Sequence, residues 1–181
     1  RIVFTILDAL SETKDIIISG VASRDKLKAK KLALSYGIDQ SFASYEDLIA
    51  SEEIDAVYIA LPNSLHFNYC ALALRNKKSV ICEKPITVCS AEYRELMTIA
   101  QRNGLIVFEA LMYQYTEPFK SLMNIIKSGE IGEVKYVESY FNYSSKSISD
   151  TDIRLSKELR GGVLNDLLYY PLSLSNGIFM N

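Results

Sequence analysis

The residues best placed to do chemistry stand at the end of a short apolar run. Val80-Ile81-Cys82 is followed directly by an acid, a base and a proline, Glu83-Lys84-Pro85. If the run is a strand of a parallel sheet, Glu83 and Lys84 lie at its carboxyl edge, where open α/β sheets hold their ligands. Pro85 biases Lys84 toward an extended conformation and so presents it on a defined backbone. The pair is therefore a candidate site, and the alternative is a weak surface ion pair.

A second candidate is Ser23-Arg24-Asp25, which follows a run of β-branched residues at Ile16–Ala22. In a dinucleotide-binding unit this position reads the adenosine ribose. An acid there favours the free 2′-hydroxyl, and an arginine accommodates a 2′-phosphate. Because Arg24 and Asp25 are both present, the choice between NAD and NADP stays open. The alternative is a solvated strand end.

The third candidate, Leu61-Pro62-Asn63-Ser64-Leu65-His66, follows the apolar run Ala56–Ala60 and begins a helix. A loop at that place forms the natural floor of a nucleotide crevice. The alternative is that Asn63 or Ser64 serves only as a helix N-cap and that His66 is a partly exposed helix residue.

Asp166 and Tyr170 are the fourth candidate, because a spacing of four residues places both on one helical face. A tyrosine beside a lysine can exchange a proton with an alcohol or a carbonyl. The alternative is a core tyrosine and a first-turn acid. Three of the four candidates are strand ends on the same edge of one sheet, in the order that a dinucleotide crevice needs.

Alternating strand and helix patterns must position these candidates. The predicted strands are residues 16–22, 41–43, 56–60, 79–82 and 105–109, and the predicted helices are residues 1–10, 25–36, 45–50, 64–76 and 91–102. Such alternation implies right-handed crossovers and a doubly wound parallel sheet, the α/β class. In the helix of residues 64–76, the pattern turns Leu65, Tyr69, Leu72 and Ala73 toward the sheet.

After the fifth strand the pattern changes. Residues 118–127 are predicted to form a helix, Val134–Tyr143 alternates as one long strand, and residues 163–171 are predicted to form another helix. Two helices and one strand cannot cover each other's apolar faces unaided. We therefore expect a second domain that is only begun.

The predicted domains are a dinucleotide-binding domain at residues 1–110 and the start of an α+β open-sheet substrate domain at residues 111–181. The first residues already have helical spacing and no initiator methionine, so we expect the chain to be incomplete at its N-terminus.

Composition excludes several classes of protein. A net charge of −2 over 181 residues argues against a nucleic-acid footprint, and no apolar run approaches the roughly 20 residues of a membrane helix. The three cysteines lack metal-ligand or redox spacing, which indicates reduced thiols in a cytoplasmic protein. With a single histidine, a multi-histidine metal site is excluded, and no metal site is predicted.

Together these stretches resemble the glucose–fructose oxidoreductase/inositol dehydrogenase (Gfo/Idh/MocA) family of NAD(P)-dependent oxidoreductases. The matching stretches are Val21–Asp25, Ser44–Leu48, Ile54–His66, Cys82–Pro85, Gly129–Val134 and Gly161–Pro171. The combination of Leu-Pro-Asn-x-x-His and Glu-Lys-Pro at this separation is highly specific. The Glu109–Tyr113 stretch most resembles the dihydrodiol dehydrogenase-like branch.

The resemblance implies a role for each matching residue. Lys84 would be the catalytic lysine that hydrogen-bonds the substrate oxygen, Tyr170 the proton donor or acceptor, and Asp166 a residue that orients the substrate. The residues implied to bind the cofactor are Ser23, Arg24, Leu61, Pro62, Asn63, His66, Glu83, Lys84 and Pro85. The implied reaction is reversible hydride transfer between NAD or NADP and a hydroxyl-bearing or carbonyl carbon of a sugar, diol or polyol. The implied assembly is a homo-oligomer, a dimer or a tetramer.

The resemblance also implies missing parts. The strand and the Gly-x-Gly-x-x-Ala turn that cradles the pyrophosphate would precede Arg1, and most of the substrate sheet would follow Asn181. We therefore expect this Rossmann-type fold to lack its first strand and Gly-rich turn, and this piece alone to be inactive although the parent protein is an active dehydrogenase or reductase. The alternative function is a non-catalytic ligand-binding or regulatory member of the same family.

Overall fold

Strands and helices alternate through the first 110 residues, as the hydrophobic pattern predicts. The structure, a computed structural model, describes residues 2–142, 144, 149 and 152–180. The described strands are β1 (Gly20–Ala22), β2 (Gln40–Phe42), β3 (Ala56–Ile59), β4 (Ser79–Cys82) and β5 (Val107–Glu109). The α-helices are α1 (Ile2–Ser11), α2 (Lys26–Tyr36), α3 (Tyr45–Ala50), α4 (Asn63–Arg75), α5 (Ser90–Asn103), α6 (Glu117–Lys127) and α7 (Tyr169–Phe179). In its described residues, the second part of the chain also has the 3₁₀ turns η1 (Met112–Tyr115) and η3 (Ile153–Leu155) and the π-helical turn η4 (Leu164–Leu168).

The strands pair in parallel and form two separate sheets, β1–β2 and β3–β4–β5. The prediction of one continuous sheet is therefore wrong for the described residues, because no described strand lies between β1 and β3 to join them. At the carboxyl edge of the three-stranded sheet, Ile59 is in register with Cys82, and Cys82 with Glu109. The loops that follow β3 and β4 consequently leave the sheet side by side.

Helix boundaries follow local capping chemistry where the sequence supplies it. The Asp25 side chain accepts hydrogen bonds from the backbone N–H groups of Leu27 and Lys28 at the start of α2. Gly37 ends that helix with φ +64°, a left-handed conformation that favours glycine. These short-range contacts explain why the predicted bounds of α2 are correct.

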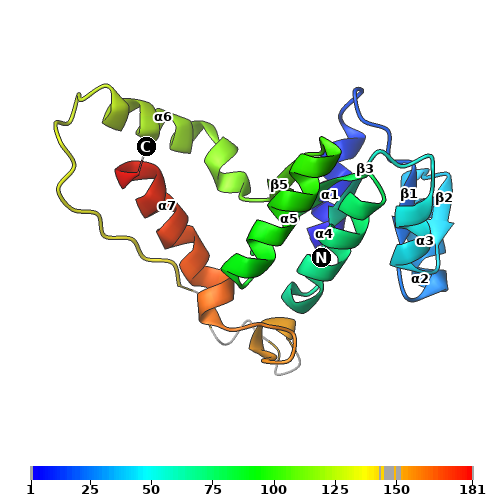
Figure 1. Ribbon diagram of the computed structural model, residues 1–181. Coiled ribbons are helices and arrows are strands. Elements are labelled where there is room, and N and C mark those ends of the chain that lie inside the picture. The colour runs from blue at the N-terminus through cyan, green and yellow to red at the C-terminus, as the bar shows by residue number, and fades with distance from the viewer. Residues whose placement is uncertain (1, 143, 145–148, 150–151, 181) are drawn as a thin grey trace.

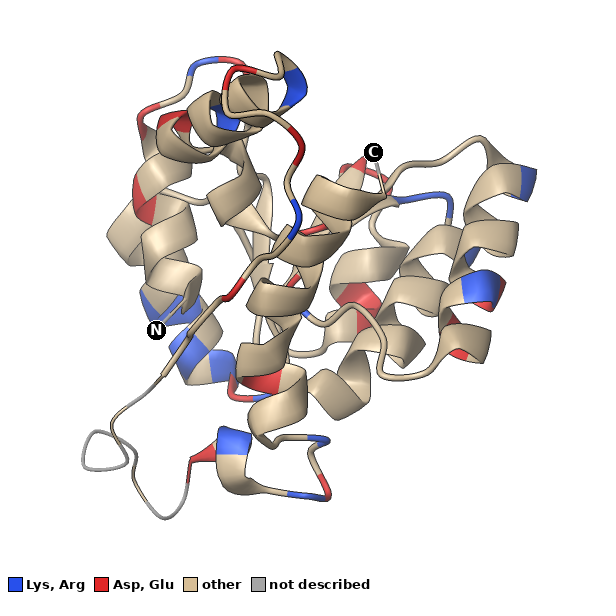
Figure 2. Ribbon diagram, turned by 90° about the vertical axis from the view of Figure 1, so that its left-hand side faces the viewer, with Lys and Arg blue, Asp and Glu red and all other residues tan. Residues whose placement is uncertain are grey.

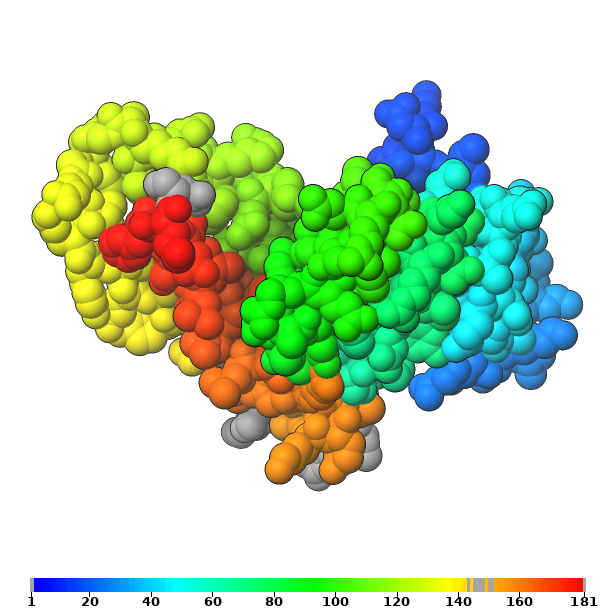
Figure 3. All heavy atoms as spheres, viewed as in Figure 1, coloured from blue at the N-terminus to red at the C-terminus, as the bar shows by residue number. Residues whose placement is uncertain are grey.

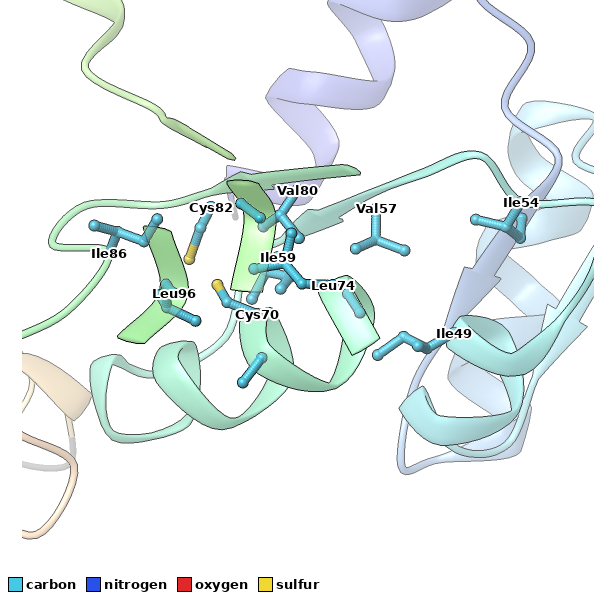
Figure 4. Close-up of a cluster of buried hydrophobic side chains, with 13 residues drawn as sticks. Ile49, Ile54, Val57, Ile59, Cys70, Leu74, Val80, Cys82, Ile86 and Leu96 are labelled. Atoms are coloured by element: carbon cyan, nitrogen blue, oxygen red, sulfur yellow. The ribbon is translucent and has the colours of Figure 1, made fainter. Parts of the chain in front are cut away.

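The main core lies between the three-stranded sheet and the helices α4 and α5 (Figure 4). Leu74, Leu96, Cys70 and Cys82 have no exposed surface, and burial of each leucine contributes about 1.5–3 kcal/mol to folding. The sulfur atoms of Cys70 and Cys82 point toward one another in Figure 4, and both cysteines are free thiols. This core fixes the position of β4, and therefore of the residues that follow it.

Helix α4 buries a face one residue away from the predicted one. Its buried residues are His66, Cys70, Ala71, Ala73 and Leu74. Leu65, Tyr69 and Leu72 are only partly buried. Because α4 packs against α5 as well as against β3 and β4, its buried arc is wider than one stripe and takes in small residues. Only Ala73 of the predicted face is fully buried.

The strand predicted at residues 16–22 is shorter than its β-branched run. β1 begins at Gly20, and the side chains of Ile16 and Ile17 are 52% and 86% exposed. Strand pairing with β2 starts only at Gly20, opposite Gln40. Before Gly20 no described strand pairs with the chain, so Ile16 and Ile17 stay outside the sheet, whereas Ile18 packs against the small cluster of Leu7, Ala33 and Ile38.

The long strand predicted at Val134–Tyr143 is not formed in its described part, residues 134–142. This segment is extended, with only Val134 and Val137 partly buried, and Tyr143 lies outside the described residues. No described strand pairs with it, so its alternating pattern has no sheet to join. Figures 1 and 3 show it as the arch that runs from the end of α6 around the outer side of α7.

The molecule is elongated, with β1, β2, α2 and α3 at one end, α4 and α5 in the middle, and α6 and α7 at the other end (Figure 1). Basic and acidic residues are interspersed along the ribbon in the view of Figure 2. Within the described residues, no helix combines the length and the apolar character that a membrane span requires.

Candidate active site

Lys84 and Asp166 form an ion pair between residues that are 82 positions apart in the sequence. The Lys84 Nζ donates to Oδ1 and to the main-chain oxygen of Asp166, both at 2.7 Å. The two side chains are 14% and 24% exposed, so the pair is mostly out of water but not sealed. Lys84 lies two residues after Cys82, the last residue of β4, at the carboxyl edge that the strand pattern predicts.

Tyr170 completes a cluster around the lysine. Its ring centroid lies 5.0 Å from the Lys84 Nζ, within the range of a cation–π contact. The rings of Phe141 and Tyr113 pack against it, with centroids 4.7 Å and 5.8 Å away. Lys84, Asp166 and Tyr170 are called the lysine cluster below. The structure thus brings together the two residues that the sequence placed on one helical face and the lysine in the loop after β4.

The loop before η4 is tied to the start of α4. The Asn63 side-chain amide donates to the main-chain oxygen of Arg160 at 2.9 Å, and the Ser64 N–H donates to the Leu159 oxygen at 3.2 Å. A cavity of about 30 Å³ beside Pro62, between these two loops, is large enough to hold at least one water molecule. Asn63 is therefore partly committed to the protein itself, and it joins the loop after β3 to the segment that leads to Asp166.

Position 161 requires glycine. A Cβ at Gly161 would lie 2.5 Å from the main-chain oxygen of Arg154, which is closer than such atoms approach in folded proteins. Arg160 in turn donates from Nη1 to Oε1 of Glu92 on α5 at 2.8 Å. The tight loop and this ion pair hold the segment before η4 against α5.

His66 lies behind the site rather than in it. Its ring is completely buried, with Nδ1 2.8 Å from the Pro85 oxygen and Nε2 2.7 Å from the Leu61 oxygen. The alternative of a partly exposed helix residue is therefore wrong for this structure, and both ring nitrogens of His66 contact the protein itself. The imidazole instead links the backbones of the two loops that follow β3 and β4. Pro85 is buried as well, and its peptide bond with Lys84 is cis.

We predict that His66→Ala lowers the free energy of unfolding by about 2–5 kcal/mol, because the carbonyl that accepts the ring N–H loses its donor and a cavity remains where the completely buried imidazole was. Urea denaturation followed by circular dichroism measures this change. Asn68→Ala, at an exposed position of the same helix, is the matched control and should stay within about 0.5 kcal/mol of the parent. Equal stability of the two variants would contradict the clamping role of His66.

Glu83 faces Tyr58, not its neighbour in the sequence. The Tyr58 hydroxyl donates to Oε1 of Glu83 at 2.7 Å. Burial, and after it this hydrogen bond, raises the pKa of Tyr58 above its ordinary value. The described ion pair of Lys84 is with Asp166, so the alternative of a Glu83–Lys84 surface pair is wrong.

Ser23, Arg24 and Asp25 lie at the carboxyl end of β1, in the two-stranded sheet. The Ser23 hydroxyl accepts a hydrogen bond from the Asp25 N–H at 3.1 Å. The Asp25 carboxylate is occupied as the N-cap of α2, whereas Arg24 is exposed. Arg24 and Asp25 left the choice between NAD and NADP open in the sequence. In the structure they differ, because only the Asp25 side chain is engaged in capping a helix.

Glu109 and Tyr169 were missed by the sequence reasoning. Glu109 ends β5, and its carboxylate accepts from the Ile86 N–H at 2.7 Å and from the Tyr169 hydroxyl. The signal was present, because an acid at the end of a buried strand is the same feature that selected Glu83. No sequence feature distinguished Tyr169 as a site residue from its neighbour Tyr170.

Models of known protein families match almost all of the chain. The model described as an oxidoreductase family with an NAD-binding Rossmann fold matches residues 5–111. The model of the GFO/IDH/MocA C-terminal domain matches residues 119–180. The chain belongs to the Gfo/Idh/MocA family of oxidoreductases. The resemblance read from the motifs is confirmed, and so is the Rossmann-type α/β fold class.

Individual relatives within the Gfo/Idh/MocA family agree with this assignment. The chain is 32% identical to the dTDP-3,4-didehydro-2,6-dideoxy-alpha-D-glucose 3-reductase of Saccharopolyspora spinosa, over 91% of this chain and 49% of the relative. It is 34% identical to the D-xylose 1-dehydrogenase (NADP(+)) 2 of Haloferax volcanii, over 86% of this chain and 47% of the relative. The chain spans about half the length of the curated relatives it matches.

A solved structure from the family has the same fold over nearly the whole chain. It is KijD10, a 3-ketoreductase from Actinomadura kijaniata, crystallised with NADP and TDP-benzene. The TM-score is 0.82 at 27% identity, and the match covers 97% of this chain and 53% of the KijD10 chain. The arrangement of the two Gfo/Idh/MocA segments found here is therefore one that a solved structure also has.

Proposed function

We propose that this Gfo/Idh/MocA protein is a dehydrogenase or reductase that transfers a hydride between NAD(P) and a hydroxyl-bearing or carbonyl carbon of a sugar, diol or polyol. The observation that carries the proposal is the lysine cluster, in which a partly buried ammonium, its paired carboxylate and a tyrosine meet at the carboxyl edge of a parallel sheet. The substrate class is supported by the relatives, which are named as a sugar reductase and a sugar dehydrogenase.

The chain's residues fit a nicotinamide dinucleotide. The strands β3 and β4 end together, and an exposed arginine follows β1, where the adenosine end of a dinucleotide lies. Leu61, Pro62 and Glu83 are partly buried at the strand ends and would line the nicotinamide end. The bound nicotinamide supplies the hydride chemistry, and the protein aligns and protonates the substrate.

Within the site, we assign Lys84 to hold the substrate oxygen by a hydrogen bond from Nζ. The ammonium stabilises negative charge that builds up on that oxygen during reduction, in a place where little water screens it. Tyr170 exchanges the proton with the oxygen through its hydroxyl. Asp166 holds the Lys84 ammonium in place through its Oδ1 contact.

The rival proposal is a non-catalytic member that keeps the fold as a ligand-binding or regulatory module. The assembled lysine cluster argues against it, because a module that only binds has no need for a proton-transferring tyrosine beside a paired lysine.

Measurement of turnover separates the enzyme proposal from the proposal of a non-catalytic module. The natural protein is incubated with NADPH or NADH and a panel of keto-sugars, and with NADP or NAD and a panel of sugars and diols, while absorbance at 340 nm is followed. A change that depends on the substrate supports the enzyme, and binding without any change supports the module.

The preferred cofactor is proposed to be NADP, because Arg24 is exposed whereas the Asp25 carboxylate caps α2. We predict that Arg24→Ala weakens NADPH binding by about 10- to 100-fold, the loss of one charge-assisted contact to a phosphate. Binding of NADH should stay within about threefold, since NADH lacks that phosphate. Fluorescence titration of both nucleotides measures the ratio, and an equal loss for both would contradict the NADP preference.

Domain division, compartment and assembly are proposed as well. We assign residues 1–110 to the dinucleotide-binding domain and residues 111–181 to the substrate and dimerisation domain. The free, buried thiols of Cys70 and Cys82, which face each other without a disulfide, support a cytoplasmic protein. A dimer or tetramer is supported by the exposed, unpaired segment of residues 134–142, and light scattering of the natural protein tests it.

A further inference from the structure

Glu109 links two parts of the lysine cluster that are far apart in the sequence. One carboxylate oxygen, Oε1, accepts a hydrogen bond from the Ile86 N–H at 2.7 Å. The other oxygen accepts from the Tyr169 hydroxyl. Ile86 comes two residues after Lys84, and Tyr169 directly precedes Tyr170. A single side chain thus joins the loop that holds the lysine to the helix that holds the tyrosine.

The surroundings make this link strong. The Ile86 residue is 3% exposed, and both Glu109 and Tyr169 are partly buried. Burial, and after it the hydrogen bond to Glu109, raises the pKa of Tyr169. The phenol therefore stays protonated and donates a hydrogen bond to Glu109. Because the groups are partly buried, breaking this hydrogen bond would leave polar atoms without a partner, which is costly.

The sheet itself fixes where Glu109 stands. Glu109 is in register with Cys82, two residues before Lys84, through the parallel pairing of β4 and β5. The Glu109 side chain is therefore attached to a strand of the sheet. The two groups that it contacts, the Ile86 N–H and the Tyr169 hydroxyl, lie on segments outside the sheet. Glu109 can therefore fix the distance between the loop after β4 and the start of α7, which neither segment fixes alone.

We propose that Glu109 is a positioning residue that sets the separation of the Lys84 ammonium and the Tyr170 hydroxyl. It acts through the Ile86 N–H and the Tyr169 hydroxyl and touches neither substrate nor cofactor. The inference rests on the proposed function, because these are the two groups assigned to the substrate oxygen. Its effect is expected on kcat, since a misplacement of about 1 Å can cost about 100-fold in rate.

The kinetic test compares three variants of the natural protein. Tyr169→Phe removes one hydroxyl, and we expect kcat to fall about 10-fold, with KM and the NADPH dissociation constant within about twofold. Glu109→Ala removes both contacts and should lower kcat about 100-fold. Glu109→Gln can accept from Ile86 through its oxygen and donate to Tyr169 through its nitrogen, so it should keep kcat within about threefold.

The matched control is Tyr36→Phe, which removes a tyrosine–carboxylate hydrogen bond to Asp8, far from the lysine cluster. It should leave kcat, KM and the dissociation constant unchanged. If Tyr169→Phe matches Tyr36→Phe in kcat, or if it lowers thermal stability and cofactor affinity without lowering kcat, Glu109 is merely structural and the inference is overturned.

A second readout is independent of turnover. Lysines are reductively methylated with ¹³C-formaldehyde, and the NMR signal of Lys84 is assigned by its absence in Lys84→Arg. We expect the Lys84 signal to shift in Tyr169→Phe and Glu109→Ala but not in Tyr36→Phe. An unchanged signal in folded Tyr169→Phe overturns the inference whatever the activity. A shifted signal in a protein that turns over no tested substrate keeps the positioning contact and refutes only the proposed function.

Discussion

Replacing Lys84 by alanine is expected to lower kcat for hydride transfer by about 10³- to 10⁴-fold, the largest effect of any single change considered. The ammonium is the only described cation in contact with both Asp166 and the Tyr170 ring, so no neighbour replaces it among the described residues. Steady-state kinetics at 340 nm, with NADPH binding measured in parallel, gives the result. Cofactor affinity should change by less than about threefold, because the lost group faces the substrate oxygen.

The control for this variant is Lys120→Ala, which removes a more exposed lysine that pairs with Glu117 on α6. It should have the kcat of the parent, since exposed pairs of this kind contribute little. The regulatory-module proposal makes the opposite prediction for Lys84→Ala, namely no change in any catalytic rate. Turnover that survives loss of Lys84 would also refute the role assigned to its ammonium.

Replacing Tyr170 by phenylalanine is expected to lower kcat by about 10²- to 10³-fold while leaving the ring in place. The aromatic packing with Phe141 and Tyr113 and the cation–π contact with Lys84 all involve the ring. The variant therefore isolates the hydroxyl. Its thermal unfolding midpoint should stay close to that of the parent, and the same kinetic assay measures the rate.

Tyr170→Ala and Tyr136→Phe complete this comparison. Tyr170→Ala also removes the ring, so it should lower stability as well as kcat, because a partly buried aromatic side chain is lost. Tyr136 is 75% exposed, and its replacement by phenylalanine should change neither quantity. If Tyr170→Phe retains the kcat of the parent, the tyrosine serves only to pack beside Lys84, and the proton has another route.

Much of the nucleotide-binding half could be predicted because its signals are local. The N-cap Asp25, the left-handed Gly37 and the strand–helix alternation act over a few residues, and the bounds of α2 and α3 follow from them. The strand predicted at residues 16–22 begins only at Gly20, because its start depends on a contact that is not local. A β-branched run forms a strand only where a neighbour pairs with it, and pairing starts at Gly20.

The face of α4 and the place of His66 could not be predicted from periodicity. A helix that packs on both a sheet and a second helix buries more than one stripe, so Ala71 and Cys70 are buried while Leu65 and Tyr69 are only partly covered. The sequence does not say that the two carbonyls contacted by His66 will lie on either side of its ring.

The sequence by itself determined the family, the α/β alternation and the three residues of the lysine cluster, because each is written in a short motif or a regular spacing. The tertiary structure decided their partners. Lys84 pairs with Asp166 and not with adjacent Glu83, and Glu109 ties Ile86 to Tyr169. Such contacts join residues separated by tens of positions, and their geometry exists only after the core has set the strands and helices in place.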